Sequence, residues 1–133
     1  MILLDTHTLI WLDEANDRLG KNARALIDHS LQSGELFVSV VSFCEVAMLV
    51  EKGRLEIEGK VTEWRKTLIE HGLKELPLLG EVAIKSAGLE GFHGDPADRM
   101  IVASAMHSGA ALCTADEKIL SWEHEIVCID ARK

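Results

Sequence analysis

The sequence has no long hydrophobic run and no excess of positive charge, and each absence excludes a class of function. Its longest apolar stretches, such as Val38–Val41 and Ala110–Cys113, are strand-sized, far short of the roughly 18 residues that a membrane span needs. Lys and Arg number 14 against 22 Asp and Glu, a net charge of −8. Nucleic-acid binding relies on clustered cations that neutralise phosphates. Any such chemistry here must therefore use bound metal ions, and no membrane partner is expected.

Cysteine is scarce as well. Cys44, Cys113 and Cys128 are odd in number, widely spaced and set among apolar neighbours. They are predicted to be buried free thiols in a reducing compartment. The segment Met1–Asp5 lacks the basic lead and the cleavage pattern of a signal peptide, so we expect a cytoplasmic protein.

What is present is the composition of a globular protein, 47% hydrophobic and 27% charged over 133 residues. No linker or repeat interrupts it, which predicts a single domain over residues 1–133. Strands are predicted at Met1–Asp5, Leu36–Val40, Leu73–Leu78, Ala110–Cys113 and Ile126–Ile129. Helices are predicted at Thr8–Ala15, Lys21–Ser33, Ser42–Lys52, Val61–His71, Glu81–Leu89, Pro96–Ser108 and Asp116–Ser121. Apolar strands alternating with helices predict an α/β fold, a three-layer α/β/α sandwich with a central, mostly parallel sheet.

Four acidic residues fall at the same edge of this predicted sheet. Asp5 ends the first strand and Asp116 follows Ala110–Cys113. Glu45 lies one helical turn beyond the second strand, and Asp98 lies in the first turn of the helix that starts at Pro96. In parallel sheets, ligands bind beyond the carboxyl ends of the strands. The four carboxylates are therefore predicted to converge on one binding site.

Carboxylate oxygens are the ligands that Mg²⁺ prefers, with Mn²⁺ as the alternative. Such ions activate water and stabilise charge on a phosphate during phosphodiester hydrolysis. Each acid has a structural alternative as well. Ser42-x-x-Glu45 has the pattern of a capping box, and Asp98 and Asp116 could compensate a helix dipole. Asp5 is harder to explain, because it ends a buried strand.

Two neighbours of Asp98 have predicted supporting roles. Asp95 precedes Pro96 and is expected to cap the helix through its side chain, with a supporting role beside the metal as the alternative. Arg99 is expected to pair with a neighbouring acid or to contact a phosphate.

Four motifs extend over nearly the whole chain: Leu4-Asp5-Thr6-His7, Ser39-Val40-Val41-Ser42 with Glu45, Asp95-Pro96-Ala97-Asp98-Arg99, and Thr114-Ala115-Asp116. In this order they resemble PIN-domain ribonucleases, and more narrowly the VapC-type toxins of bacterial toxin–antitoxin pairs. The resemblance implies an endoribonuclease that depends on Mg²⁺ or Mn²⁺, a cognate antitoxin and a homodimer. By motif match, Asp5, Glu45, Asp98 and Asp116 take the catalytic, metal-binding positions, and Thr6 and Thr114 take supporting polar positions. Ala97 and Cys44 depart from the larger aromatic residues that the family often has there.

Two alternatives stay open on the same fold. One is a PIN ribonuclease that acts in RNA processing without an antitoxin, and the other is a catalytically inactive interaction module. A phosphatase with Asp-x-Asp on its first strand is disfavoured, because His7 stands in the place of the second acid.

Overall fold

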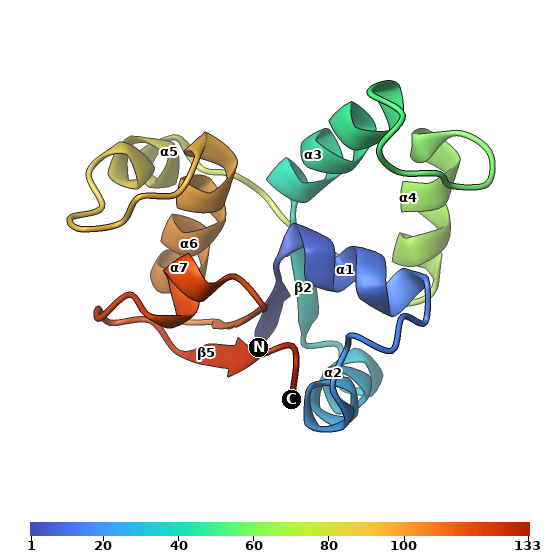
Figure 1. Ribbon diagram of the computed structural model, residues 1–133, viewed down its shortest axis with the longest axis horizontal. Coiled ribbons are helices and arrows are strands. Elements are labelled where there is room, and N and C mark those ends of the chain that lie inside the picture. The colour runs from blue at the N-terminus through green and yellow to red at the C-terminus, as the bar shows by residue number, and fades with distance from the viewer.

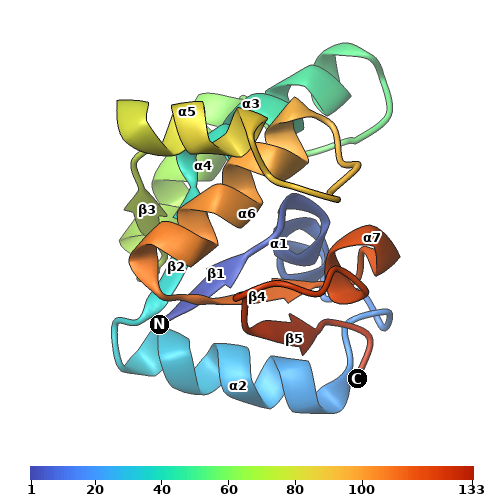
Figure 2. The same cartoon turned by 90° about the vertical axis from the view of Figure 1, so that its left-hand side faces the viewer.

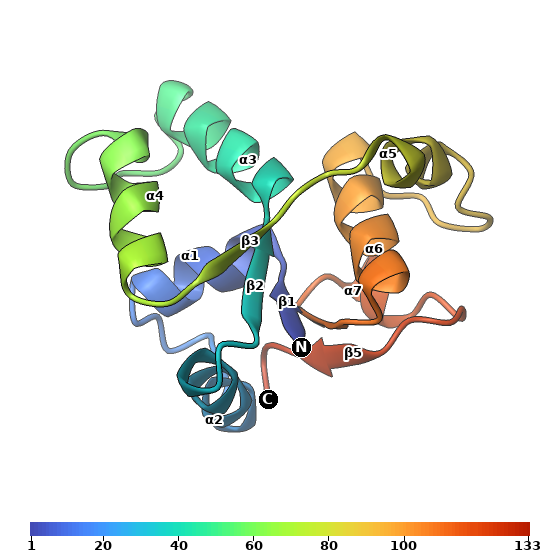
Figure 3. The ribbon, with the colours of Figure 1, turned by 180° about the vertical axis from the view of Figure 1, so that it is seen from behind.

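The computed structural model describes residues 1–133 and is built on a five-stranded sheet in the order β3-β2-β1-β4-β5, in which every neighbouring pair is parallel. The strands are β1 (Ile2–Leu4), β2 (Leu36–Ser39), β3 (Lys74–Leu76), β4 (Ala111–Thr114) and β5 (Cys128–Asp130). The predicted α/β fold with a parallel sheet is confirmed. In Figure 3 the edge strand β3 passes in front of β2, and Pro77, which cannot donate a ladder hydrogen bond, follows its last residue.

Seven helices connect and cover the strands. They are α1 (Thr6–Asp13), α2 (Lys21–Gln32), α3 (Val40–Glu51), α4 (Val61–Glu70), α5 (Gly80–Ala87), α6 (Pro96–Ser108) and α7 (Glu117–Leu120). Every predicted element is present, with both ends within two residues of the observed ones. None of the helices is both long enough and apolar enough to cross a bilayer.

Alternate residues of the central strand β1 divide the core in two, because successive side chains of a strand point to opposite faces. Ile2 and Leu4 pack in one buried cluster with α1 and α2, and α4 packs against its margin. Leu3 packs in the other cluster with α6 and α7. Figure 1 shows α5, α6 and α7 on one side of the strands and α1, α2 and α4 on the other, with α5 lying against α6. This is the predicted α/β/α sandwich.

Two helices begin two residues earlier than predicted, and both differences bear on the site. α1 begins at Thr6, because the side chain of Asp5 caps it and accepts the N–H of Thr6 at 2.9 Å. α3 begins at Val40, because the hydroxyl of Ser39 caps it and accepts the N–H of Val41 at 3.1 Å. Ser42 is then inside α3 and is not its cap. The capping-box interpretation of Glu45 is therefore wrong.

The prediction of three buried thiols holds only in part. Cys113 on the inner strand β4 is fully buried, Cys128 on the edge strand β5 is partly buried, and Cys44 is exposed. Cys44 lies on the outer face of α3 beside the half-exposed Met48, with 4.0 Å between the two sulfur atoms. No disulfide forms.

Candidate metal centre

The site is built where helices start at the carboxyl edge of the sheet. α3 follows β2 directly, one residue separates α1 from β1, and two residues separate α7 from β4. The N-terminus of α6 lies at the same edge, because α6 returns antiparallel to the strands before β4 (Figure 2). Three of these four helices are capped by an acid, Asp5 on α1, Asp95 on α6 and Asp116 on α7. The caps themselves thus bring negative charge to this edge.

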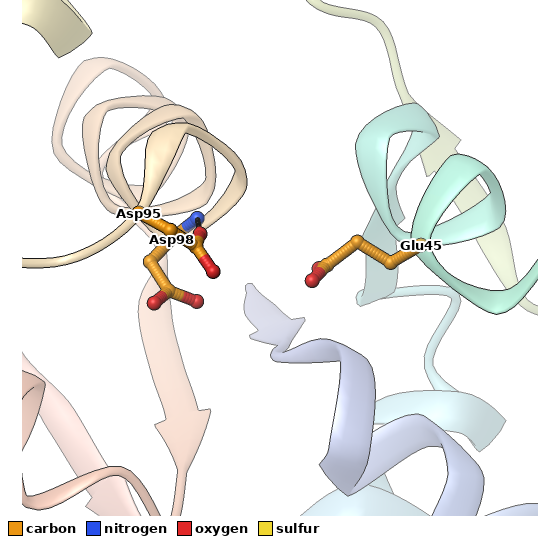
Figure 4. A group of neighbouring side chains, drawn as sticks. All are labelled: Glu45, Asp95 and Asp98. Atoms are coloured by element: carbon orange, nitrogen blue, oxygen red, sulfur yellow. Dashed lines mark hydrogen bonds between the residues drawn. The ribbon is translucent and has the colours of Figure 1, made fainter. Parts of the chain in front are cut away.

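Three carboxylates form a compact group between α3 and α6. One oxygen each from Glu45, Asp95 and Asp98 lies within 4.8 Å of the others. Figure 4 shows Glu45 extending from α3 across the gap towards the two aspartates on α6. Asp95 caps α6 as predicted, because its Oδ1 accepts the N–H of Asp98 at 2.9 Å. Its second carboxylate oxygen receives no hydrogen bond from the protein and is available to a cation.

Asp5 lies at the floor of this group with both of its oxygens already engaged. It is only 2% exposed. Its Oδ1 accepts the N–H of Thr6 at 2.9 Å, and its Oδ2 accepts the hydroxyl of Thr114 at 2.6 Å. The same hydroxyl accepts the N–H of Asp116 at 3.1 Å. Thr114 therefore holds Asp5 and the start of α7 in a fixed relation.

Thr6 positions Glu45 as Thr114 positions Asp5. Its hydroxyl contacts the Oε1 of Glu45 and lies 2.9 Å from the hydroxyl of Ser42. Because a hydroxyl carries a single proton, Thr6 donates it to the carboxylate and accepts from Ser42. Glu45 is thus aimed at the aspartates by two buried hydroxyl residues of α1 and α3.

Asp116 stands apart from the compact group. Its Oδ1 accepts the N–H of Lys118 and caps α7 at 2.9 Å. Its charge nevertheless acts on the group, since it is one of the carboxylates that raise the pKa of Asp98. The structure thus brings Glu45, Asp95 and Asp98 together, with Asp5 beneath them and Asp116 at the margin.

The electrostatics of the group favour a cation. Burial is the largest of the causes that raise the pKa of Asp98 to about 7, and the charges of Asp95, Asp5, Asp116 and Glu45 add to it in that order. Burial likewise raises the pKa of Glu45, against the hydrogen bond from Thr6, which lowers it. Repulsion among close carboxylates keeps a proton in the site. A divalent cation would replace that proton, and oxygen-only donors fit Mg²⁺ and Mn²⁺.

His7 connects Asp5 with the segment between β4 and α7. Its Nε2 accepts the N–H of Ala115 at 3.1 Å, and its Nδ1 lies 3.7 Å from the Oδ2 of Asp5. Because Nε2 accepts, the ring proton is on Nδ1 and faces the carboxylate. No sequence signal shows that His7 holds the segment leading to Asp116, because this contact depends on the fold.

Arg99 differs from its expected role. Its guanidinium donates to three backbone carbonyls, those of Ser86, Phe92 and Gly94, and it pairs with no acid. The fork of N–H groups suits this task, because carbonyls in the last turn of a helix, where Ser86 lies, and in the irregular chain between α5 and α6 have no helical or sheet partners. Arg99 therefore fixes the segment that leads into the cap residue Asp95.

We expect Thr114→Val to lower the free energy of unfolding by about 1–3 kcal/mol. The valine would leave one buried oxygen of Asp5 and the N–H of Asp116 without partners. Thr114→Ser keeps the hydroxyl and should stay close to the parent protein. Urea unfolding of the three proteins measures the difference, and equal losses for valine and serine would show that the hydroxyl contributes nothing.

Comparison with known proteins identifies the family. Residues 2–123 match the PIN domain family. The chain belongs to the PIN-domain family. It is 35% identical over 124 residues to "Ribonuclease VapC22" of Mycobacterium tuberculosis, and the match covers 92% of each chain. The VapC-type resemblance that the motifs indicated is confirmed.

Solved structures agree on the PIN fold. A chain of the Rickettsia felis VapBC2 complex bound to a promoter DNA fragment superposes with a TM-score of 0.72 at 12% identity, over 97% of this chain and 98% of that one. A chain of the DNA-bound VapBC complex of Salmonella typhimurium gives 0.68 at 18% identity, over 97% and 96%. PIN nucleases use divalent metal ions, and this PIN domain carries a matching acidic group at the edge of its sheet.

Proposed function

We propose that this PIN domain is a metal-dependent endoribonuclease and the toxin of a type II toxin–antitoxin pair. The observation that carries the proposal is the compact group of Glu45, Asp95 and Asp98 in a chain of this family. Two comparisons support it: the curated relative is named a ribonuclease, and the similar folds come from VapBC complexes.

In this proposal Asp5, Glu45, Asp98 and Asp116 are the catalytic, metal-binding residues, and Asp95 adds a further oxygen. A bound Mg²⁺ or Mn²⁺ supplies an acidic water and stabilises the charge that develops on the phosphate. The chain's own part is to fix the geometry. Thr6 orients Glu45, and Thr114 orients Asp5.

The proposed metal also reconciles an acidic protein with an acidic substrate. Without a cation, the carboxylates that raise the pKa of Asp98 would repel a phosphodiester by the same field. With a divalent cation in place, the sign of the field at this edge is reversed. RNA would then be drawn to the site although the chain as a whole carries a charge of −8.

Incubation of the purified chain with total bacterial RNA tests the activity. We expect discrete cleavage products with Mn²⁺ or Mg²⁺ and intact RNA with EDTA, and sequencing of the new RNA ends would identify the cleavage site. Cleavage that persists in EDTA would contradict the metal-dependent mechanism. Intact RNA under all conditions would favour the inactive interaction module.

The partners are proposals of the same kind. A cognate antitoxin is expected to bind the chain and inhibit cleavage, so the product of a short neighbouring reading frame should copurify with it and stop the reaction. If no such product exists, a role in RNA processing without an antitoxin is favoured. A homodimer and a cytoplasmic location stay predictions. The exposed Cys44 and Met48 on α3 are one apolar surface that a second copy could cover.

A further inference from the structure

A pocket of about 450 Å³ lies between the segment that precedes α6 and the segment that follows the start of α7. We call it the Trp122 pocket, and its lining residues are Gly91, His93, Lys118, Ser121, Trp122, Glu123 and His124. The same two segments lead to the metal centre. His93 lies two residues before the cap Asp95, and Lys118 donates its backbone N–H to Asp116. The pocket is therefore connected to the acidic group through these two segments.

The base of this pocket is a fixed aromatic stack. The rings of Trp122 and His124 are stacked, with centroids 4.2 Å apart and planes inclined by 28°. The buried ring of Phe92 supports the indole at 5.3 Å. The indole N–H donates to the carbonyl of Glu90 at 3.0 Å, which sets its orientation. His124 is exposed, so its imidazole continues the π-surface of Trp122 out to solvent.

One cationic group, the ammonium of Lys118, lines this pocket in a chain with a net charge of −8. Lys118 is exposed and forms no salt bridge, and His93 is exposed next to it in the pocket lining. Glu123 is the one acid that lines the pocket. The adjacent Glu117 is neutralised by Arg132, at 2.7 Å between Oε1 and the guanidinium. An ammonium group free to meet a phosphate is thus placed next to a stacking surface.

We propose that the Trp122 pocket binds one nucleotide of a single-stranded RNA substrate, with its base stacked on His124 and a neighbouring phosphate at Lys118. This proposal rests on the proposed ribonuclease function and extends it to substrate choice. Every base has a π-face, but in a duplex that face is covered by the next base pair. A pocket of this kind selects unpaired segments, and its position would anchor the strand beside the metal centre.

The stacking part of the proposal is tested by His124→Ala and His124→Phe. Steady-state cleavage is measured on a single-stranded RNA that contains the mapped cleavage site. Loss of one stacked base should raise KM about 5- to 50-fold in His124→Ala and leave kcat within about twofold. His124→Phe keeps an aromatic face and should stay near the parental KM. His29→Ala, an exposed histidine on α2, is the matched control. A KM for His124→Ala equal to that of the control would overturn the stacking role.

The phosphate part is tested by the salt dependence of binding. A short fluorescein-labelled single-stranded RNA is titrated in EDTA, so that binding is measured without cleavage. A lost phosphate contact should lower the slope of log Kd against log salt concentration by about 0.7 in Lys118→Ala. Lys66→Ala, on the exposed face of α4, should leave the slope unchanged. A slope for Lys118→Ala equal to that of the parent protein would remove Lys118 from the interface.

The two proposals fail in different ways. Metal-dependent cleavage with unchanged KM and unchanged slope in both pocket variants would leave the ribonuclease standing and overturn the pocket. Binding that depends on Lys118 and His124 without any cleavage would leave the pocket standing and overturn the ribonuclease. A parent protein that neither binds nor cleaves single-stranded RNA would overturn both.

Discussion

The Asp98→Asn variant is expected to lose RNA cleavage and yet to be more stable than the parent protein when no metal is present. Replacing a carboxylate of the compact group by an amide weakens the hold on a cation at the reacting phosphate. A loss of roughly 4 kcal/mol of transition-state stabilisation corresponds to about 10³-fold in kcat. The gain in stability has a separate cause: without a metal, the negative charge of Asp98 is half buried beside other carboxylates and destabilises the folded protein.

That gain depends on pH in a direction fixed by the pKa of Asp98. Its folded-state pKa is about 7, against an ordinary value of 3.8. Below about pH 4 both states are protonated and Asp98 has no effect on the free energy of unfolding. Between about pH 4 and pH 7 the unfolded chain releases the proton first, so this group lowers stability as the pH rises. Above pH 7 the loss is constant.

Asp98 is half buried, and solvent screening reduces the effect to about 1–2 kcal/mol. In EDTA at pH 8, Asp98→Asn should therefore unfold at a higher temperature than the parent protein, and at pH 4 the two should coincide. Added Mn²⁺ should raise the unfolding temperature of the parent protein more at pH 8 than at pH 5, and should have little effect on the variant. Differential scanning calorimetry measures all of these.

Asp28→Asn provides the control, because Asp28 is an exposed acid in the middle of α2. It makes the same chemical change far from the acidic group, so activity and metal response should both match the parent protein. If Asp98→Asn cleaved RNA as well as Asp28→Asn, Asp98 would have no catalytic role. If the metal-free variant were less stable than the parent protein at pH 8, burial and repulsion of the Asp98 charge would not limit the stability of the site.

The fold could be predicted because its signals are local and redundant. The strands are short apolar runs, and the helices carry their own stop signals, as where Gly109 takes the left-handed conformation after α6. The placement of Asp5 and Asp98 at one edge followed from parallel topology alone. What topology could not give was the direction of each side chain, and this decided that Asp95 joins Glu45 and Asp98 while Asp116 stands apart.

The errors share a physical reason, which is competition among residues for the same role. The pattern Ser42-x-x-Glu45 predicts a helix start at Ser42, but Ser39 caps α3, because β2 ends at that residue. Arg99 was expected to pair with a neighbouring acid or to contact a phosphate. It donates instead to three backbone carbonyls, one in the last turn of α5 and two in the irregular chain that follows. Which backbone carbonyls lack a partner near Arg99 can be seen only when the path of the chain is known.

Arg99→Met is expected to be the most damaging substitution outside the acidic group. It keeps the length of the aliphatic stem and removes the donors to the carbonyls of Ser86, Phe92 and Gly94. Hydrogen bonds from a charged donor contribute about 1.5–3 kcal/mol each, and partial exposure lets water replace some of them. We expect the free energy of unfolding to fall by about 2–4 kcal/mol, measured by urea denaturation. Arg99→Lys should recover little, because an ammonium cannot reproduce the fork.

Arg99→Met should change both kcat and KM, because the segment that Arg99 holds contributes to the acidic group and to the Trp122 pocket. Gly94 packs so closely that an added Cβ would lie 2.5 Å from the Phe92 ring and 2.9 Å from the Cβ of Asp98. Loosening this contact displaces the acidic group, which lowers kcat, and displaces the support of Trp122, which raises KM. Arg54→Met, an exposed arginine just after α3, is the control. A fall in kcat with an unchanged KM would show that this segment does not support the Trp122 pocket. A free energy of unfolding equal to that of Arg54→Met would show that water replaces Arg99 as the partner of the three carbonyls.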